Sequence, residues 1–484
     1  MKRIFLKRLL LPAIGTMCLF FYTLPALAQD AGRVQELQQV IEAQQKQLDA
    51  QQKQLDAQRH LLQELQKQLQ PLVKDAGGKE TPAIVQKPGV LPEPAKARPQ
   101  GVVGLSEADK RDRESPTGSN VTYFDTTRVV NIPGTNTDLG LHGLIQFQMF
   151  HDTNGLNNNR FDTATIPING APAQTKFSVN PTQIRLSSTT RVEENRLNTM
   201  LSMDFNGQLD RPEPRLRVAY GEYVNNDLGL GILGGQAYST MNDLQAAPET
   251  LDFAGPAGMW QTRQPLLRFT KSLSKSMLTE FSAETPENVV YMNAQKLTRW
   301  PDFAAAGTWR FGGNYFKHIR LAGLARDLGA QGVSGATDSA FGWAVAGSTK
   351  VGLPFLGAKD SFKITVHYGD GYGTQVKGGP AEGAFNPATS SLETIGIFGT
   401  YSGLQHFWSD QWRSNLVYGH VNADNPEFVP GTTYDNTHYA AADLIWNPYQ
   451  SLDVGIEYLW GRRENKDGSA GTSNRYLFSS RLKF

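Results

Sequence analysis

This sequence has almost no cysteine. Its single cysteine among 484 residues, Cys18, lies in an N-terminal segment with the features of a secretory signal. Basic residues at the start are followed by an apolar run over residues 9–21 and then by the small-x-small sequence Ala26-Leu27-Ala28, which predicts removal of residues 1–28. The mature chain would then contain no cysteine, which excludes disulfides and cysteine-based metal sites.

The chain also lacks an excess of charge and any later hydrophobic run long enough for a membrane helix. Loss of the signal removes four of the 47 basic residues and leaves 43 against 46 acidic residues, so a polybasic nucleic-acid-binding protein is not expected. No window after the signal approaches the roughly 18 apolar residues of a spanning helix. A content of 39% hydrophobic residues is nevertheless compatible with a transmembrane barrel, because only alternate residues of its strands face lipid.

A coiled coil that forms an oligomer is predicted directly after the signal, over residues 33–70. Apolar residues recur there every seven positions, which is the period of one seam of a coiled coil. These residues are Val34, Ile41, Leu48, Leu55, Leu62 and Leu69. The other seam carries Gln44, Gln51 and Gln58, and stacked polar layers can fix the register and strand number of an oligomer. The proline-punctuated residues 71–120 are expected to form an extended or disordered linker.

Residues 121–484 are predicted to form an all-β transmembrane barrel of about 16 antiparallel strands. From Leu139 onward apolar and polar residues alternate, which is the period of β-strands. The predicted strands begin near residues 139, 176, 197, 214, 229, 260, 276, 303, 317, 339, 359, 392, 411, 437, 452 and 473. A soluble sandwich also alternates, so the connections decide between the two folds. Short links such as 192–195 alternate with long ones such as 240–259, which is typical of outer-membrane barrels with tight turns in the periplasm.

The even strand number places both ends of the barrel, and therefore the coiled coil, on the periplasmic side of a Gram-negative outer membrane. The last predicted strand carries apolar residues on one face up to a terminal aromatic, Phe484. Such an ending resembles the signal by which outer-membrane barrels are recognised for assembly. Outer-membrane lipid and lipopolysaccharide are therefore expected partners, and peptidoglycan or periplasmic proteins are candidate partners of the coiled coil.

Five stretches of the barrel region carry a family resemblance. They are NIPGTNTDLGLHG at 131–143, GGQAYSTMNDLQAAPETLDFAGPAG at 234–258, HYGDGYGT at 367–374, LQHFWSDQWRSNLVYGHVN at 404–422, and residues 444–484. These stretches resemble the DcaP-type porins, a family of trimeric outer-membrane channels associated with dicarboxylic acids. The resemblance implies a 16-stranded barrel, a homotrimer and a preference for small anionic solutes such as dicarboxylates. The arrangement is also similar to sugar and phosphate-selective porins with a coiled-coil extension, whose motifs fit this chain less well.

The long loop over residues 240–259 is the candidate constriction. It follows the fifth predicted strand, where 16-stranded porins place their constriction, and the sequence leaves open whether it folds into the lumen or lies over the mouth of the barrel. Alternation then turns arginines inward on the second, fourth and sixth strands, with Leu216, Val218 and Tyr220 expected outside. The candidate solute-binding residues are Arg185, Arg215, Arg217, Arg263, Arg268, Gln236 and Tyr238. Guanidinium groups keep their charge and pair with carboxylates.

Three acids of this loop, Asp243, Glu249 and Asp252, are expected to lie across the lumen from the arginines. Such an arrangement would create a transverse electric field at the narrowest point. Arg263 has the opposite strand parity but adjoins the loop. The selectivity hypothesis therefore depends on how these acids and arginines are placed relative to one another.

Enzymatic activity, metal sites and cofactors are not expected. The sequence has no Gly-x-Ser-x-Gly, His-Glu-x-x-His or phosphate-loop motif, and its eight histidines lack metal-ligand spacing. Passive diffusion of small anions is the function predicted. The alternatives are a sugar or general-diffusion porin, for which only Tyr238 and Tyr223 supply inward aromatics, and a structural protein that tethers the envelope through its coiled coil.

Overall fold

The computed structural model describes residues 129–484, apart from residues 157, 209 and 312–316. The predicted signal, coiled coil and linker lie outside the described residues. The described part has two 3₁₀ turns, η1 (Thr163–Thr165) and η2 (Gly373–Gln375), and otherwise strands and loops. Among these residues no helix is long and apolar enough to cross a membrane.

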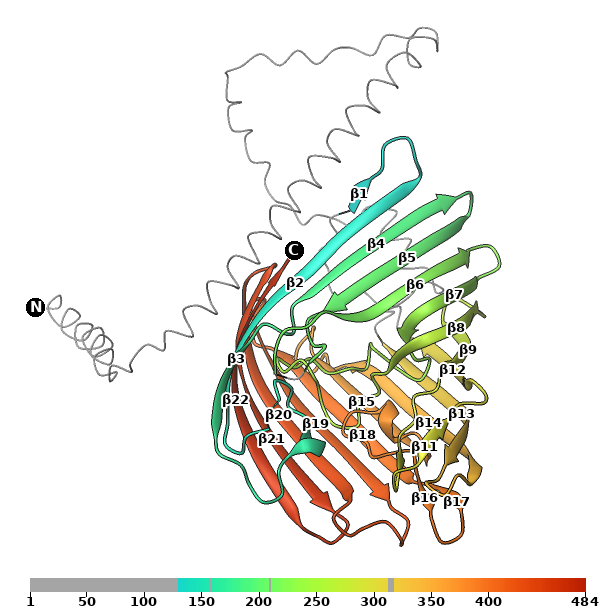
Figure 1. The fold of residues 1–484 in the computed structure, drawn as a ribbon. Helices are drawn as coiled ribbons and strands as arrows, with labels where there is room; N and C mark the ends of the chain where they lie inside the picture. Colours follow the sequence, from blue (N-terminus) through green and yellow to red (C-terminus); the bar gives the residue numbers. More distant parts are fainter. Residues whose placement is uncertain (1–128, 157, 209, 312–316) are drawn as a thin grey trace, which may run out of the picture. The chain divides into compact units, whose positions relative to one another are not determined.

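A single closed sheet forms the wall of the molecule (Figure 1). Sixteen long strands pair with their neighbours in antiparallel order, and the last pairs with the first. They are β2 (Thr137–Asp152), β4 (Gln183–Val192), β5 (Asn195–Asp204), β6 (Arg215–Asn225), β7 (Leu230–Tyr238), β8 (Arg263–Ser272), β9 (Met277–Glu284), β12 (Asp302–Arg310), β13 (His318–Gln331), β14 (Thr337–Gly352), β15 (Ser361–Asp370), β18 (Gly396–Phe407), β19 (Trp412–Asp424), β20 (Tyr434–Tyr449), β21 (Leu452–Asn465) and β22 (Ala470–Lys483). The prediction of a 16-stranded antiparallel barrel is confirmed.

The remaining strands are short additions to this wall. Three of them join the main sheet: β1 (Val129–Asn131), β3 (Gln174–Ser178) and β11 (Gln295–Leu297). β3 pairs with the second half of β2 while β4 pairs with the first half, so β3 and β4 together border one strand. A separate small sheet within the long loops contains β10 (Val290–Tyr291), β16 (Gly383–Asn386) and β17 (Ser391–Thr394).

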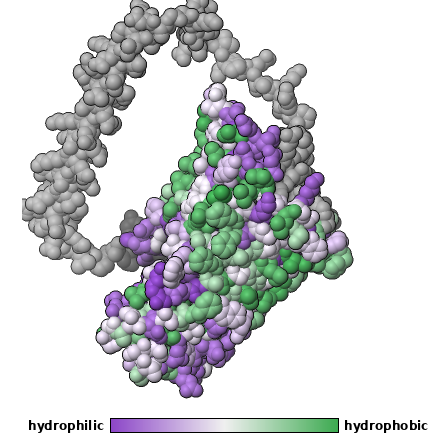
Figure 2. Space-filling model, turned by 90° about the vertical axis from the view of Figure 1, so that its right-hand side faces the viewer, coloured by the Kyte–Doolittle hydropathy of each residue, from purple (hydrophilic) through white to green (hydrophobic). Residues whose placement is uncertain are grey.

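The wall is apolar outside and polar inside, as the alternation predicts. On β2, Leu141 is 52% exposed whereas the adjacent His142 is 6% exposed. Figure 2 shows hydrophobic residues gathered over the outer face of the strands, with hydrophilic residues toward the ends. Because apolar side chains are more stable in contact with lipid than with water, this outer face is typical of a membrane-spanning barrel.

Two rims distinguish the ends of the barrel. Links of a few residues, such as 193–194 and 273–276, join strands at one rim. Most links at the other rim are long, such as 239–262 and 371–395, and two of them, 332–336 and 466–469, are short. These are called the short-turn rim and the long-loop rim below, and their alternation confirms the predicted pattern of connections.

One predicted orientation is wrong. Val218 and Tyr220 were expected on the outer face, but they are 5% and 8% exposed and face the lumen. The reason is a β-bulge in β6: Ser202 pairs with Val218 while the next residue of β5, Met203, pairs with Leu216. The extra residue, Arg217, reverses the alternation for the rest of the strand. Arg215 and Arg217 keep the predicted inward direction because both precede the reversal.

The closing seam of the barrel offers a test of the fold. Gly143 and Phe484 exchange backbone hydrogen bonds of 2.9 and 3.1 Å, and a Cβ on Gly143 would overlap the Phe484 ring. We expect Gly143→Ala to lower the unfolding free energy by about 1–3 kcal/mol through overpacking. The measurement is the temperature at which the folded band disappears in semi-native gel electrophoresis.

The matched control for this substitution is Gly221→Ala. Gly221 also lies within a wall strand, but no atom lies within 4 Å of its added Cβ. It should therefore leave the transition unchanged or raise it slightly. Equal shifts for the two variants would show that the seam contact is not responsible.

Candidate constriction and solute pathway

The loop over residues 239–262 crosses the lumen and is attached to walls far from its own strands. Near its start, the backbone N–H of Thr240 donates to Glu284 of β9 at 2.8 Å. At its tip, the backbone of Leu251 contacts β2 and β21. Near its end, the carbonyl of Gly258 contacts His367 Nε2 of β15 at 2.7 Å. Of the two positions that the sequence leaves open for this loop, these contacts support the one inside the lumen.

Asp243 attaches the first part of the loop to β13 and β14. Its carboxylate contacts His318 Nε2 at 2.6 Å and accepts a hydrogen bond from Ser348 Oγ at 2.5 Å. Burial by itself would raise the pKa of Asp243, but the contact with His318 and the charge of Arg320 outweigh it and hold the pKa at about 2. Asp243 is therefore an ionised anchor at neutral pH.

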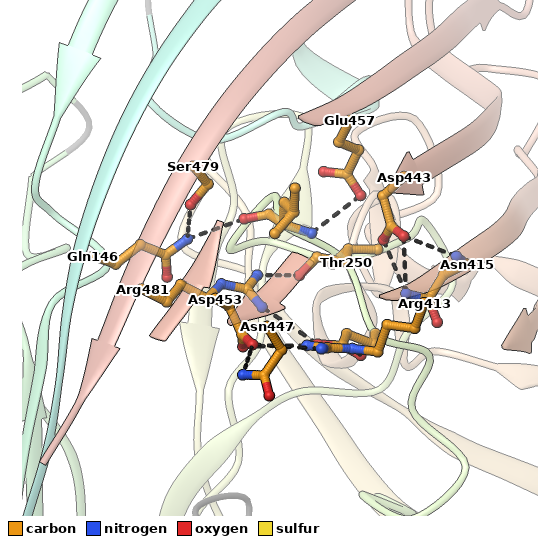
Figure 3. Close-up of polar contacts among 12 residues, drawn as sticks. Gln146, Thr250, Arg413, Asn415, Asp443, Asn447, Asp453, Glu457, Ser479 and Arg481 are labelled. Carbon is orange, nitrogen blue, oxygen red and sulfur yellow. Dashed lines mark hydrogen bonds and ion pairs between the residues drawn. The ribbon is translucent and has the colours of Figure 1, made fainter. Parts of the chain in front are cut away.

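Figure 3 shows the attachment of the loop tip. The Glu457 carboxylate of β21 accepts hydrogen bonds from the backbone N–H groups of Leu251 and Asp252, at 3.1 and 2.6 Å. The side-chain amides of Gln146 and Gln148 on β2 donate to the Leu251 carbonyl at 3.1 and 2.9 Å. The wall thus satisfies the backbone groups of a loop segment that is buried away from water.

Glu249 binds the same region of the wall through its side chain. It forms a paired contact with the Arg413 guanidinium of β19 at 2.8 and 2.9 Å, and it accepts a hydrogen bond from Gln405 at 2.8 Å. Although burial raises its pKa, the contact with Arg413 and the charge of Arg481 hold the pKa below its usual value. Glu249 is thereby neutralised by wall residues.

Asp252 has a structural role at the loop tip. Its carboxylate accepts hydrogen bonds from the backbone N–H groups of Phe161 and Ala254, at 3.3 and 3.1 Å. It also lies 3.7 Å from Arg475 and 3.9 Å from Lys377. Among the described residues, no ion pair within 4.0 Å joins Asp252, Asp243 or Glu249 to Arg215, Arg217, Arg263 or Arg268. The loop acids therefore serve to anchor the loop.

The predicted arginines gather on the opposite side of the loop. Arg215 and Arg217 share the buried Asp204 carboxylate, at 2.7 and 2.8 Å. Arg217 also donates to the hydroxyl of Tyr238 at 2.8 Å, and the Arg263 guanidinium lies 5.4 Å from the centre of the Tyr238 ring. The side chain of Arg263 thus joins this arginine cluster despite the outward parity of its position.

Gln236 and Arg268 have different roles. The Gln236 amide donates to the carbonyl of Arg217 at 3.2 Å, and Gln236 lies beside the cluster. Arg268 instead donates to Thr240 Oγ1 at 2.8 Å and lies 3.9 Å from Glu280. It supports the start of the loop and lines a separate small cavity of about 90 Å³ between the loop and β6–β13.

A cavity of about 760 Å³ runs past the loop. It is lined by residues of the long-loop side, such as Arg160, and of the short-turn side, such as Lys363. Nine basic side chains line it: Arg160, Arg185, Arg215, Arg217, Arg263, Lys363, Lys377, Arg481 and Lys483. Five acidic ones do: Asp162, Glu249, Asp252, Glu287 and Asp453. Since Glu249 and Asp453 are themselves held by Arg413, the open path is electropositive.

Five of these basic residues were not among the predicted site residues. Strand alternation placed Lys363, Arg481 and Lys483 on the inner face, so their parity could have identified them as pathway residues. Arg160 and Lys377 lie in irregular loop segments. Such segments have no regular alternation from which the direction of a side chain can be predicted. They reach the path because the long loops fold inward.

Comparison with solved structures identifies the architecture. The structure is similar to the outer-membrane channel DcaP of Acinetobacter baumannii, with a TM-score of 0.66 and 21% identity over 72% of this chain and 98% of that chain. The chain has the fold of an outer-membrane channel. It is also similar to an anion-selective porin from Comamonas acidovorans, with a TM-score of 0.50 and 9% identity over 72% and 100% of the two chains. No family model matches the chain, and no curated protein is significantly similar in sequence.

The loop anchor at Glu457 can be tested by removing its carboxylate. Glu457→Ala leaves two buried backbone N–H groups without an acceptor. Each unsatisfied N–H group costs about 1–3 kcal/mol of stability. We expect the loop tip to detach and the single-channel conductance in planar bilayers to rise and become noisier. Glu427→Ala, which removes an exposed acid from a long loop, should not change the conductance; a rise in both variants would contradict the role of Glu457.

The depressed pKa of Asp243 predicts the pH range of the first anchor. A carboxylate whose pKa falls from 3.8 to about 2 on folding stabilises the structure fully above pH 3.8, and this stabilisation is lost as pH falls through 2. We therefore expect the conductance difference between the wild type and Asp243→Asn to persist from pH 8 to pH 4 and to disappear near pH 2. A difference that already vanishes near pH 5 would contradict this assignment.

Proposed function

We propose that the protein is an outer-membrane porin that lets small anionic solutes, dicarboxylates in particular, diffuse passively into the periplasm. The observation that carries this proposal is the basic excess along the cavity that passes the loop. A cation-lined, narrow path raises the local concentration of anions and repels cations. The fold supports the proposal because it is shared with outer-membrane channels.

The chemistry of the lining favours carboxylates among anions. Arg217 is held by Asp204 and Tyr238, so its guanidinium is oriented before a solute arrives. A guanidinium can offer two parallel N–H donors to a carboxylate. Further basic groups line the path on other strands, including Lys363 of β15 and Arg481 of β22. A solute with a carboxylate at each end can therefore meet a cation at both ends.

We further propose that the channel is a homotrimer and that residues 33–70 form its coiled coil in the periplasm. The heptad pattern and the short-turn rim next to the start of β2 support this arrangement. Deletion of residues 33–70 should weaken trimers, as measured by chemical cross-linking, and leave solute uptake through each barrel intact. Intact uptake with a damaged envelope would instead favour a tethering function.

The arginine cluster is the direct test of anion selectivity. In planar bilayers with a salt gradient, the wild type should give an anion-selective reversal potential. Arg185→Ala with Arg217→Ala should reduce the anion-to-cation permeability ratio several-fold, because two cations leave the path. Arg185→Lys with Arg217→Lys should retain anion selectivity but lose preference for carboxylates over chloride.

The matched control removes two positive charges away from the path. Lys275 and Lys359 are exposed and lie in short turns, so Lys275→Ala with Lys359→Ala should leave the reversal potential unchanged. A cation-selective wild type would overturn the proposal. Liposome swelling with dicarboxylates and uncharged sugars separates it from the sugar-porin alternative, which predicts faster entry of sugars.

A further inference from the structure

Arg160 reaches the path from the long-loop side of the barrel. It belongs to the link over residues 153–173, between β2 and β3, and it lines the cavity of about 760 Å³ that passes the constriction loop. Its Nη2 donates to the backbone carbonyl of Asn206. Asn206 belongs to the next link on this rim, residues 205–214 between β5 and β6. Arg160 therefore joins two long loops where the path opens toward them.

The contact with the Asn206 carbonyl uses only part of the Arg160 guanidinium. That group carries five N–H donors, and the contact occupies one nitrogen. Arg160 Nε is buried and makes no hydrogen bond to any described residue. A neutral donor, such as a side-chain amide, would hold the same carbonyl without a charge. The charge of Arg160 and its remaining donors therefore need another explanation.

The acids around Arg160 are engaged by other groups. Asp204 and Asp252 each have two other basic partners within 4.0 Å. The Asp162 carboxylate caps the 3₁₀ turn η1, where it accepts a hydrogen bond from a backbone N–H group at 3.1 Å. In the part of the chain that the structure describes, none of these three acids forms an ion pair with Arg160 within 4.0 Å. Arg160 thus keeps its charge available to a solute.

Arg160 and Arg215 are held by the same support. Arg215 Nε and the backbone N–H of Asn206 both donate to Asp204 Oδ1, each at 3.0 Å, and the carbonyl of Asn206 accepts from Arg160. Burial and the charge of Arg215 lower the pKa of Arg160, and the effect of Arg215 is larger than the opposite effect of Asp204. The two guanidiniums therefore repel each other, and an anion bound to both would relieve this repulsion.

We propose that Arg160 and Arg215 form an anion-binding site at the long-loop end of the path, which takes one carboxylate of a dicarboxylate that enters from that side. Both residues line the same cavity. Arg215 binds Asp204 through Nε and Nη2, which leaves its Nη1 without a hydrogen bond to any described residue. A loop guanidinium and a wall guanidinium can therefore each donate to one carboxylate. This inference rests on the proposed anion-conducting function, and it assigns the capture of the solute to a loop residue.

A site at one end of the path predicts a one-sided effect on solute entry. Succinate added to one compartment of a planar bilayer should interrupt the single-channel chloride current, and the frequency of the interruptions gives its association rate from that side. Arg160→Gln keeps an N–H donor for the Asn206 carbonyl and removes the charge. It should lower the association rate from the long-loop side about fivefold, because the attraction of the anion to this end is lost, and leave the rate from the short-turn side unchanged.

The orientation of each channel is assigned with a cysteine in a short turn. All channels carry Lys275→Cys, because Lys275 is exposed in the turn over residues 273–276 and the mature chain is predicted to contain no other cysteine. After the rates are measured, a long polyethylene-glycol maleimide is added to one compartment. A fall in conductance identifies that compartment as the short-turn side.

Two further variants test the role of the charge. Arg160→Lys should keep the association rate close to that of the wild type but shorten each interruption, because an ammonium binds a carboxylate as a point charge. Arg215→Gln, in which Arg217 still pairs with Asp204, should show the same one-sided loss as Arg160→Gln. It carries the test if Arg160→Gln lacks the heat-modifiable band of a folded barrel.

The matched control is Arg299→Gln, which removes an arginine from another long loop. Arg299 is exposed, is paired with Asp327 and is not among the residues that line the cavity, so both association rates should stay unchanged. Equal losses from the two sides in Arg160→Gln, or an Arg160→Lys channel as slow as Arg160→Gln, would overturn the inference.

The reversal potential of the same wild-type preparation separates the two proposals. Cation selectivity would overturn the proposed function. Anion selectivity combined with an unchanged association rate from the long-loop side in folded Arg160→Gln or Arg215→Gln channels would overturn the Arg160 site alone.

Discussion

Backbone hydrogen bonding within a closed sheet is the constraint on which the rest of the structure depends. In lipid, an unpaired N–H or C=O costs several kcal/mol, so a strand wall must have no open edge. The pairing of β2 with β22 removes that edge. Once the wall is closed, side chains of alternate residues have only two environments, and the alternation of the sequence follows directly from this division.

Closure also determines how the loop over residues 239–262 must be held. A loop inside the lumen brings its own backbone groups out of bulk water, and they need partners there. The wall supplies these partners with inward carboxylates and amides, chiefly Glu457, Glu284 and the two glutamines of β2. The polar inner face therefore stabilises the loop, in addition to any effect that it has on solutes.

The electrostatic character of the path is a consequence of this attachment. Asp243 and Glu249 are bound by the walls that hold the loop, whereas the arginine cluster shares a single buried acid, Asp204, through Arg215 and Arg217. The result is an electropositive passage in a chain that is close to neutral overall. Local pairing, and not net charge, decides which sign of charge a solute meets.

The sequence by itself determined the strand number, the two kinds of rim and the inward direction of Arg185, Arg215 and Arg217, because a period of two and the spacing of turns are local properties. It could not reveal the bulge in β6 that turns Val218 and Tyr220 inward, since a one-residue register shift depends on the partner strand. Nor could it show that the loop acids bind His318, Arg413 and the loop's own backbone. Those contacts join residues far apart in the chain, and only closure of the barrel brings them together.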